Sequence, residues 1–358
     1  MTLRPAIEPL DEAAMAAVRA HLDRLTKPPG SLGRLERLVE QLAGITGSSA
    51  PRVDRPAVVV FAGDHGVTAR GVSAYPSDVT AQMVANFIRG GAAINVLADA
   101  AGAELVVVDV GVSGDGPPSN PAVPGAARLV QARIAAGTRD MTVEPAMRRN
   151  EALAAIEVGR RIVKQLIDSG IDTIAVGEMG IGNTTAASAL VAALTDRPPV
   201  EVTGRGTGLD AEAVGRKVAV IEAALARHRP RRDDPIGALT AVGGFEIAAL
   251  VGAILAAAEA RTPVVLDGFI TGSAALVAAS IAPGLGPRLI ASHRSAEPGH
   301  AAVIDELGLD PLLDLELRLG EGSGAALALP LLRAATQVLA RMATFDTAGV
   351  SGPVPKAP

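Results

Sequence analysis

Two stripes of apolar residues open the chain, and each has the spacing of an amphipathic helix. The first comprises Met15, Val18, Leu22 and Leu25, and the second comprises Leu35, Leu38, Leu42 and Ile45. The segment KPPG at residues 27–30 interrupts the chain between them, and Ser31 is placed to cap the second helix. The pattern therefore predicts two helices near the amino terminus.

From residue 57 onwards the pattern changes to short, continuous apolar runs, each followed by a Gly-rich turn and an Ala-rich segment. The runs are residues 57–61, 104–110, 173–176, 263–266 and 289–291. Continuous hydrophobicity indicates strands buried on both faces, and hence a mostly parallel sheet flanked by helices. We therefore expect a Rossmann-like α/β fold, in which ligands bind beyond the carboxyl ends of the strands.

Alternation of apolar and polar residues returns near the carboxyl end. The leucines at positions 313, 315, 317 and 319 alternate with polar residues, which predicts a half-buried extended segment. A helix over residues 325–342 follows, and Pro330 should kink it or mark its first turns. We expect a small helical domain built from both chain ends (residues 1–27 and 306–358), a large α/β domain over residues 28–305, and a disordered tail at 351–358.

The composition excludes several classes of protein. A chain of 358 residues is long enough to bury a large apolar core. The absence of Cys rules out disulfides, thiolate zinc sites and Cys nucleophiles, and is compatible with a reducing cytoplasm. A net charge of −5, one Tyr, five Phe and no Trp argue against a nucleic-acid partner, which would require basic faces and aromatic stacking platforms.

The hydrophobic content of 49% raises the question of a membrane. Residues 268–287 carry no charged side chain, but Gly and Pro interrupt the stretch, which favours a buried α/β element over a membrane span. The first 15 residues contain no apolar core of signal-peptide length. We therefore expect a cytoplasmic protein without a membrane span.

Five glycine-rich segments place acidic, hydroxyl or basic residues after expected strands. They are residues 61–66 (FAGDHG), 177–185 (GEMGIGNTT), 204–208 (GRGTG), 292–297 (SHRSAE) and 318–324 (RLGEGSG). In the second segment, glycine lets the backbone approach a ligand, and the following helix offers N–H groups to a phosphate. A tight strand-to-helix turn without a ligand is the alternative, because such turns are common in α/β folds.

Two glutamates in these segments are candidates for chemistry. Glu178 would repel a phosphate in its own loop, so we expect it to face a hydroxyl or ring N–H of the ligand. Glu321 lies between Gly320 and Gly322 just before a helix, where it can project into a cleft at the strand ends. Taken alone, however, a glutamate of a surface turn is the favoured interpretation of Glu321.

Nothing in the sequence has the spacing of a metal site. The residues that could act as ligands are Asp64, His65, His293 and His300. None of the five histidines is paired at metal-site spacing, and such residues in turns usually bond local backbone, so we expect no metal. Asp233 and Asp234 resemble the acidic pair of enzymes that use phosphoribosyl pyrophosphate, but the small-hydroxyl loop that should follow is missing, which favours a solvated linker.

A set of segments spread over most of the chain is more specific than any one glycine loop. In chain order they are LTKPPGSLGRLE, FAGDHGV, GVSAYPSDVTAQMVANF, GEMGIGNTT, GRGTGLD, VGGFEIAALVGA, LDGFITGSAAL, SHRSAEPGH and RLGEGSGAALA. Together they resemble the nicotinate-nucleotide:dimethylbenzimidazole phosphoribosyltransferase (CobT) family of the cobalamin pathway.

The resemblance implies a Rossmann-like large domain, a small helical domain from both chain ends, and a homodimer. It assigns the general base to Glu321 and a second active-site glutamate to Glu178. The nucleotide site would comprise Gly180, Gly182, Asn183, Thr184, Lys217, Ser295 and Gly320. The base site would comprise Ser73, Tyr75, Gln82, Met83 and Leu319. The partners would be nicotinate mononucleotide and dimethylbenzimidazole, with no cofactor and no metal.

The implied reaction moves the 5-phosphoribosyl group of nicotinate mononucleotide onto 5,6-dimethylbenzimidazole, giving α-ribazole 5′-phosphate and nicotinate. The pyridinium ring leaves neutral at its nitrogen, the attacking imidazole gives its N–H proton to a carboxylate base, and direct attack inverts C1′. Two alternatives stay open. A regulator that has lost catalysis would be expected to lack Glu321 or Glu178, and a sugar or nucleotide kinase needs a metal–phosphate loop that we do not find in the sequence.

Overall fold

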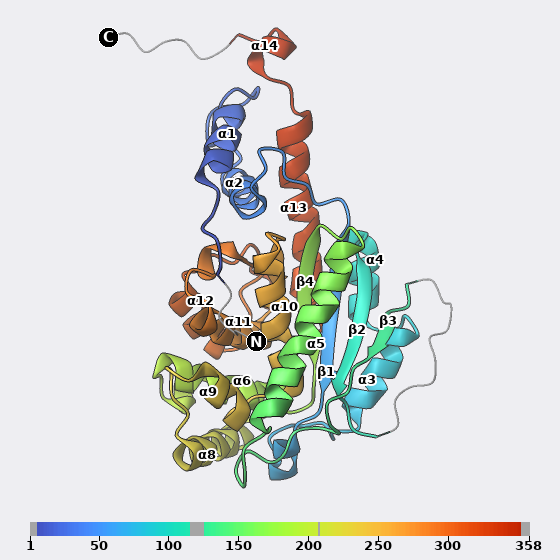
Figure 1. The fold of residues 1–358 in the computed structure, drawn as a ribbon, viewed down its shortest axis with the longest axis vertical. Coiled ribbons are helices and arrows are strands. Elements are labelled where there is room, and N and C mark those ends of the chain that lie inside the picture. Colours follow the sequence, from blue (N-terminus) through green and yellow to red (C-terminus); the bar gives the residue numbers. More distant parts are fainter. Residues whose placement is uncertain (1–5, 115–124, 207, 352–358) are drawn as a thin grey trace.

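The fold is built around a parallel sheet (Figure 1). The computed structural model describes residues 6–114, 125–206 and 208–351, and these form six strands in the order β3-β2-β1-β4-β5-β6, with neighbouring strands parallel. The strands are β1 (Pro56–Gly63), β2 (Glu104–Gly111), β3 (Arg128–Gln131), β4 (Thr173–Met179), β5 (Val264–Leu266) and β6 (Leu289–Ala291). The α/β prediction is confirmed. Residues 352–358, in the tail expected to be disordered, lie outside the described residues.

Alternate residues of β1 enter two apolar cores, one on each face of the sheet. Ala57, Val59 and Phe61 pack with residues of α5 (Arg149–Asp168), α6 (Asn183–Thr195), α10 (Phe245–Glu259) and α11 (Phe269–Ile281). Val58 and Val60 pack with residues of α3 (Val79–Ile88), α4 (Ala93–Ala101) and α13 (Ser323–Arg341). Burial on both faces explains why these strands carry continuous rather than alternating hydrophobicity.

Further elements complete the layers. They are η1 (Gly66–Arg70), α7 (Pro199–Val202), α8 (Ala211–His228), α9 (Pro235–Val242), η2 (Gly286–Arg288), α12 (Gly299–Leu307) and α14 (Phe345–Ala348). Asp234 caps α9 by accepting from the Gly237 N–H, and Asp233 pairs with Arg231, so these two acids have surface roles in the structure.

All five apolar runs become strands, but two features of the sheet differ from the sequence pattern. The edge strand β3 has exposed ends at Arg128 and Gln131, so it has no apolar run from which a strand could be predicted. Residues 313–319 form no strand: Leu313 makes one parallel bridge with His293, and Leu315 is 54% exposed. The prediction of a half-buried extended segment was therefore wrong for its later part, whose leucines stand beside the cavity described below.

The amino-terminal helices α1 (Glu12–Leu22) and α2 (Arg34–Thr46) pack against the upper half of α13 (Figure 1). Val18 of α1, Leu42 of α2 and Leu332 of α13 belong to one buried cluster. The predicted cap at Ser31 was wrong, because α2 begins at Arg34 after Gly33, and no side chain caps it. The division of the chain into two domains stays a prediction.

Among the described residues, the 19-residue helix α13 is long and apolar enough to cross a membrane by length and composition alone, with a mean hydropathy of 1.2 over an 18-residue stretch. However, 56% of this stretch is buried, and it begins against the sheet and continues between α2 and α4 (Figure 1). Pro330 lies inside it. Most of the charge-free stretch 268–287 forms α11, whose residues are largely buried in the core, as expected of a buried α/β element.

Candidate functional site

A cavity of about 690 Å³ opens at the carboxyl ends of β4, β5 and β6. Its wall is formed by the start of α3, the β4–α6 loop, Gly206, the loops that follow β5 and β6, and residues 316–321. This is the edge at which parallel α/β sheets bind their ligands.

Ten of the candidate residues lie on this wall. They are Glu178, Gly180, Asn183, Thr184, Ser295, Gly320, Glu321, Tyr75, Met83 and Leu319. Tyr75 and Leu319 are 54% and 55% exposed, so they stand at the mouth of the cavity.

Four candidates lie off the wall. Gly182 precedes α6, and Lys217 of α8 lies behind Thr184. Ser73 accepts a hydrogen bond from the Tyr75 N–H, while Gln82 is exposed on α3. These positions leave the roles of Ser73 and Gln82 in base binding as predictions.

Glu178 is the penultimate residue of β4 and is buried. The Asn183 side-chain amide donates to its carboxylate, and the Glu321 N–H donates to its backbone carbonyl at 3.1 Å. Burial raises the pKa of Glu178 well above its usual value, and the negative charges of Asp267 and Glu246 add to the shift. Its surroundings therefore favour the protonated form of this carboxyl group over the carboxylate.

Glu321 is held in an unusual backbone conformation for a non-glycine residue, with φ of +63°. It is buried, the Ile94 N–H donates to its carboxylate, and its Oε2 has no protein partner among the described residues. Burial, with a smaller contribution from the Asp267 carboxylate, raises the pKa of Glu321 to about 7. The hydrogen bond from Ile94 acts in the opposite direction and lowers it. A carboxylate with a pKa near neutrality and a free oxygen suits a general base.

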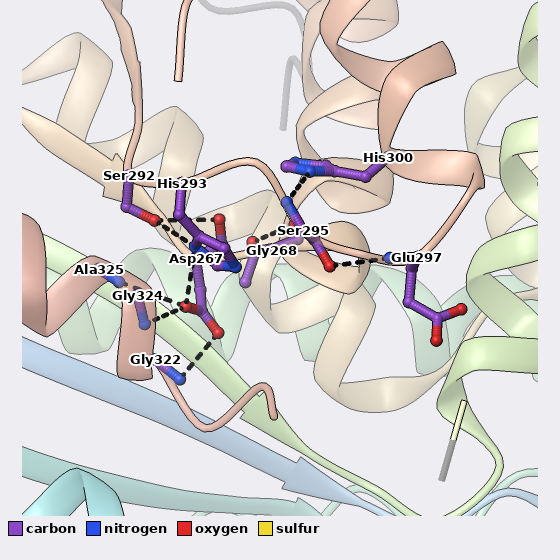
Figure 2. A network of polar contacts seen from close by, with 11 residues as sticks. Asp267, Gly268, Ser292, His293, Ser295, Glu297, His300, Gly322, Gly324 and Ala325 are labelled. Carbon is purple, nitrogen blue, oxygen red and sulfur yellow. Dashed lines mark hydrogen bonds and ion pairs between the residues drawn. The ribbon is translucent and has the colours of Figure 1, made fainter. Parts of the chain in front are cut away.

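Asp267 holds the turn that carries Glu321 (Figure 2). It follows β5 and accepts hydrogen bonds from the N–H groups of Gly322, Gly324 and Ala325 at 3.1, 2.7 and 3.2 Å. These donors belong to the first turn of α13 and its approach, so Asp267 acts as the cap of that helix. Burial raises the pKa of Asp267 to about 7, although the backbone donors oppose the shift.

A second group of contacts surrounds Lys217. Its Nζ donates to Thr184 Oγ1 at 2.7 Å, and Glu297 accepts from the Gly206 N–H at 2.9 Å. Burial lowers the pKa of Lys217 to about 8, although the negative charge of Glu297 acts to raise it. A buried ammonium next to the first turn of α6 makes this end of the cavity suitable for an anion.

The histidines near the cavity are buried and carry local hydrogen bonds (Figure 2). His300 Nδ1 accepts from the Ser295 N–H at 2.9 Å, and His293 Nδ1 lies 3.0 Å from Ser292 Oγ. Burial lowers the pKa of His293. Burial also lowers the pKa of His300, to about 3, and the nearby positive charges of His293 and Arg294 contribute to that shift. Across residues 6–114, 125–206 and 208–351, no group of three His, Asp or Glu side chains is arranged to hold a metal ion.

Several residues of the cavity wall were given no role in substrate binding or catalysis from the sequence. They are Asp267, Gly268, Phe269, His293, Glu297, Glu316 and Arg318. A signal for Asp267 existed, because it immediately follows the apolar run 263–266, as Glu178 follows 173–176. Glu297 lay in the predicted segment 292–297, but its contact with Gly206, far away along the chain, could not be predicted.

A parallel sheet whose carboxyl ends carry glycine-rich loops and ionisable carboxylates around a cavity is typical of an α/β enzyme that acts on a nucleotide. A family model described as "Phosphoribosyltransferase" matches residues 7–350. This chain belongs to the nicotinate-nucleotide–dimethylbenzimidazole phosphoribosyltransferase (CobT) family, as its similarity to individual members shows.

A nicotinate-nucleotide–dimethylbenzimidazole phosphoribosyltransferase of Chloroflexus aggregans is 58% identical over 345 residues, which cover 96% of each chain. The protein of the same name from Roseiflexus sp. (strain RS-1) is 56% identical over 348 residues, or 97% of each chain. The crystal structure of CobT from Thermus thermophilus matches with a TM-score of 0.89 and 49% identity, over 95% of this chain and 99% of that one.

Proposed function

We propose that this protein transfers the 5-phosphoribosyl group of nicotinate mononucleotide to 5,6-dimethylbenzimidazole, for the lower-ligand nucleotide of cobalamin. The observation that carries the proposal is the pair of buried glutamates, Glu178 and Glu321, on the wall of one cavity in a chain of this family. The similar proteins named above bear the name of this activity. Both glutamates are present, which argues against a regulator that has lost catalysis.

In the proposed mechanism, Glu321 is the general base. Its unpartnered Oε2 takes the N–H proton of the benzimidazole as the other ring nitrogen attacks C1′. The bond from C1′ to the pyridinium nitrogen breaks at the same time, and nicotinate leaves with that electron pair. Glu178 lies beside the ribose, where the positive charge of the nucleotide favours ionisation of its carboxyl group.

The phosphate is proposed to bind at the start of α6, against the backbone of residues 180–184 and beside Lys217 and Ser295. The base is proposed to bind between Tyr75, Met83 and Leu319, at the mouth of the same cavity. A homodimer, a cytoplasmic location and the two-domain division are parts of the proposal. Light scattering of the purified protein tests the dimer.

The product tests the function. Incubation of the two substrates without added metal should give nicotinate and the α-anomer of ribazole 5′-phosphate, because a single displacement inverts the β-linked carbon. Proton NMR of the C1′ signal identifies the anomer. A β-anomer, or exchange of labelled nicotinate into the mononucleotide without base, would instead indicate a covalent ribosyl-glutamate and two inversions.

The rate should depend on pH through Glu321. Because the pKa of Glu321 is raised to about 7 and only its carboxylate accepts a proton, kcat/KM should rise with pH up to about 7 and then level off. Initial rates measured from pH 5.5 to pH 9 in one ionic-strength series test this expectation. A profile that is flat across pH 6–8 would contradict the assignment of the base.

Replacement of Lys217 by Ala should weaken the nucleotide alone. The ammonium group donates to Thr184, at the start of α6 where the phosphate is proposed to bind, and it lies away from the proposed base site, so KM for nicotinate mononucleotide should rise by at least about tenfold. KM for dimethylbenzimidazole should change by less than about twofold. Lys164→Ala, on the outer surface of α5, is the matched control, and equal effects on both substrates would make Lys217 structural.

A further inference from the structure

A second cluster of buried charges lies behind the cavity and contributes nothing to its wall. His65 follows β1 and Glu246 lies in the first turn of α10, and His65 Nε2 stands 2.7 Å from Glu246 Oε1. Their side chains are 1% and 0% exposed. The two residues belong to the FAGDHG and GGFE segments, which the proposed mechanism does not use.

His65 and the end of β1 touch the loop that follows Glu178 and carries the proposed phosphate-binding backbone. A Cβ on Gly180 would overlap the Gly63 carbonyl oxygen, and a Cβ on Gly182 would come within 3.3 Å of His65 Cβ. The loop therefore rests directly on the end of β1 and on His65, with glycine at both points of contact.

A hydrogen-bonded link fixes the same loop from α3. The Ile181 N–H donates to Thr80 Oγ1 at 3.1 Å, and the Thr80 hydroxyl bonds to the Asp64 carboxylate. Asp64 is anchored in turn by the Ser113 N–H at 2.7 Å. Asp64 and His65 thus support successive parts of one loop, through a side chain and through direct packing.

The charges of the cluster also reach the cavity. Burial alone would lower the pKa of His65, but the charge and hydrogen bond of Glu246, with Asp64, raise it above its usual value. Glu246 thus favours the charged form of the His65 imidazole, and the negative charge of Glu246 is also one of the neighbours that raise the pKa of Glu178. If His65 were lost, Glu246 would be a buried anion without its partner, a costly state that is relieved only by protonation or by movement.

We propose that His65 and Glu246 are positioning residues for the nucleotide: as a buried pair, they hold residues 178–182 from behind in the conformation that binds the phosphate and the ribose. The inference rests on the proposed function. It predicts that the pair affects binding of nicotinate mononucleotide without contacting it, and leaves binding of the base unaffected.

The test compares His65→Gln, Glu246→Gln and the double variant. Titration calorimetry measures Kd for nicotinate mononucleotide in the absence of base, and initial rates give KM for each substrate. His65→Gln should raise the nucleotide Kd by about tenfold or more and leave KM for dimethylbenzimidazole within about twofold. The double variant, with two amides and no unpaired charge, should return to within about threefold of the wild-type Kd.

His228→Gln is the matched control. The distance from His228 Nε2 to the Met141 carbonyl oxygen is 2.7 Å, and neither residue lines the cavity, so the nucleotide Kd of this variant should not change. If His65→Gln does not fold, Glu246→Gln takes its place: the His65 ring then loses its carboxylate partner, so the nucleotide Kd should rise, and the double variant should again bring it back toward the wild-type value.

An unchanged nucleotide Kd, equal effects on the two substrates, or no rescue in the double variant would each overturn the positioning role. The proposed function is judged separately on the wild-type protein. If that forms no α-ribazole 5′-phosphate, the function is wrong, whereas normal wild-type turnover with unaffected variants rejects only the role of the pair.

Discussion

Glu321→Gln should fold normally and lower kcat by about 10²- to 10⁴-fold, the usual contribution of a positioned general base. An amide keeps the shape of the side chain and can still accept the Ile94 hydrogen bond, but it cannot take a proton. The rise of the rate with pH up to about 7 should also disappear in this variant, because the titrating group is gone. Stopped assays with separation of α-ribazole 5′-phosphate measure kcat over this range.

Two further variants show whether the loss belongs to base chemistry. Glu321→Asp retains a carboxylate but draws it back by one methylene group, so its kcat should lie between those of the wild type and Glu321→Gln. Glu212→Gln, on the exposed surface of α8, should leave kcat unchanged. Near-normal kcat in Glu321→Gln, with the fold verified by circular dichroism, would remove Glu321 as the base.

The sheet could be predicted from the sequence because its central strands are buried on both faces. Val58, Val59 and Val60 have no exposed surface, so the run remains apolar without interruption. The edge strand β3 pairs with β2 alone and has polar ends. Its four residues are too few and too exposed to stand out as an apolar run. Edge strands are in general the part of a parallel sheet that a hydrophobic pattern defines least.

The two glutamates could be predicted because each stands in a glycine-rich turn next to an expected strand or helix, and because the family resemblance named them. Their surroundings could not be predicted in this way. The contacts from Asp267 to Gly322 and from Glu297 to Gly206 join segments 55 and 91 residues apart. No local period encodes such contacts, because they arise only when parallel strand ends meet at one edge of the sheet.

The exposed leucines show the opposite error. Alternation over residues 313–319 has the period of a strand, yet a strand also needs a neighbour with free backbone groups. β6 is only three residues long, and beyond it the backbone of residues 292–296 bonds to Leu313 and Leu317 without forming a regular strand, because Glu316 between them has a φ of +56°. Leu319 is therefore available at the mouth of the site, where an aromatic base can cover it.

Asp267→Ala should produce the largest combined loss of stability and activity outside the proposed base itself. The substitution leaves the buried N–H groups of Gly322, Gly324 and Ala325 without their acceptor, so unfolding should require about 3 kcal/mol less free energy. The turn that holds Glu321 would lose its anchor, and kcat should fall by about 10²-fold. Guanidinium unfolding and initial rates measure the two effects.

The electrostatic part of the same prediction has a definite sign. The Asp267 carboxylate raises the pKa of Glu321, so its removal should lower that pKa and move the acid limb of kcat/KM to lower pH. Asp267→Asn should shift the limb in the same direction but lose less stability, because its carbonyl oxygen still accepts from α13.

Asp11→Ala removes an ordinary cap from α1, where Asp11 accepts from the Ala14 N–H at 2.9 Å, and should cost about 1 kcal/mol with kcat unchanged. If Asp267→Ala matched this control in both respects, Asp267 would be a simple helix cap, and the position of Glu321 would have to be set by its other neighbours.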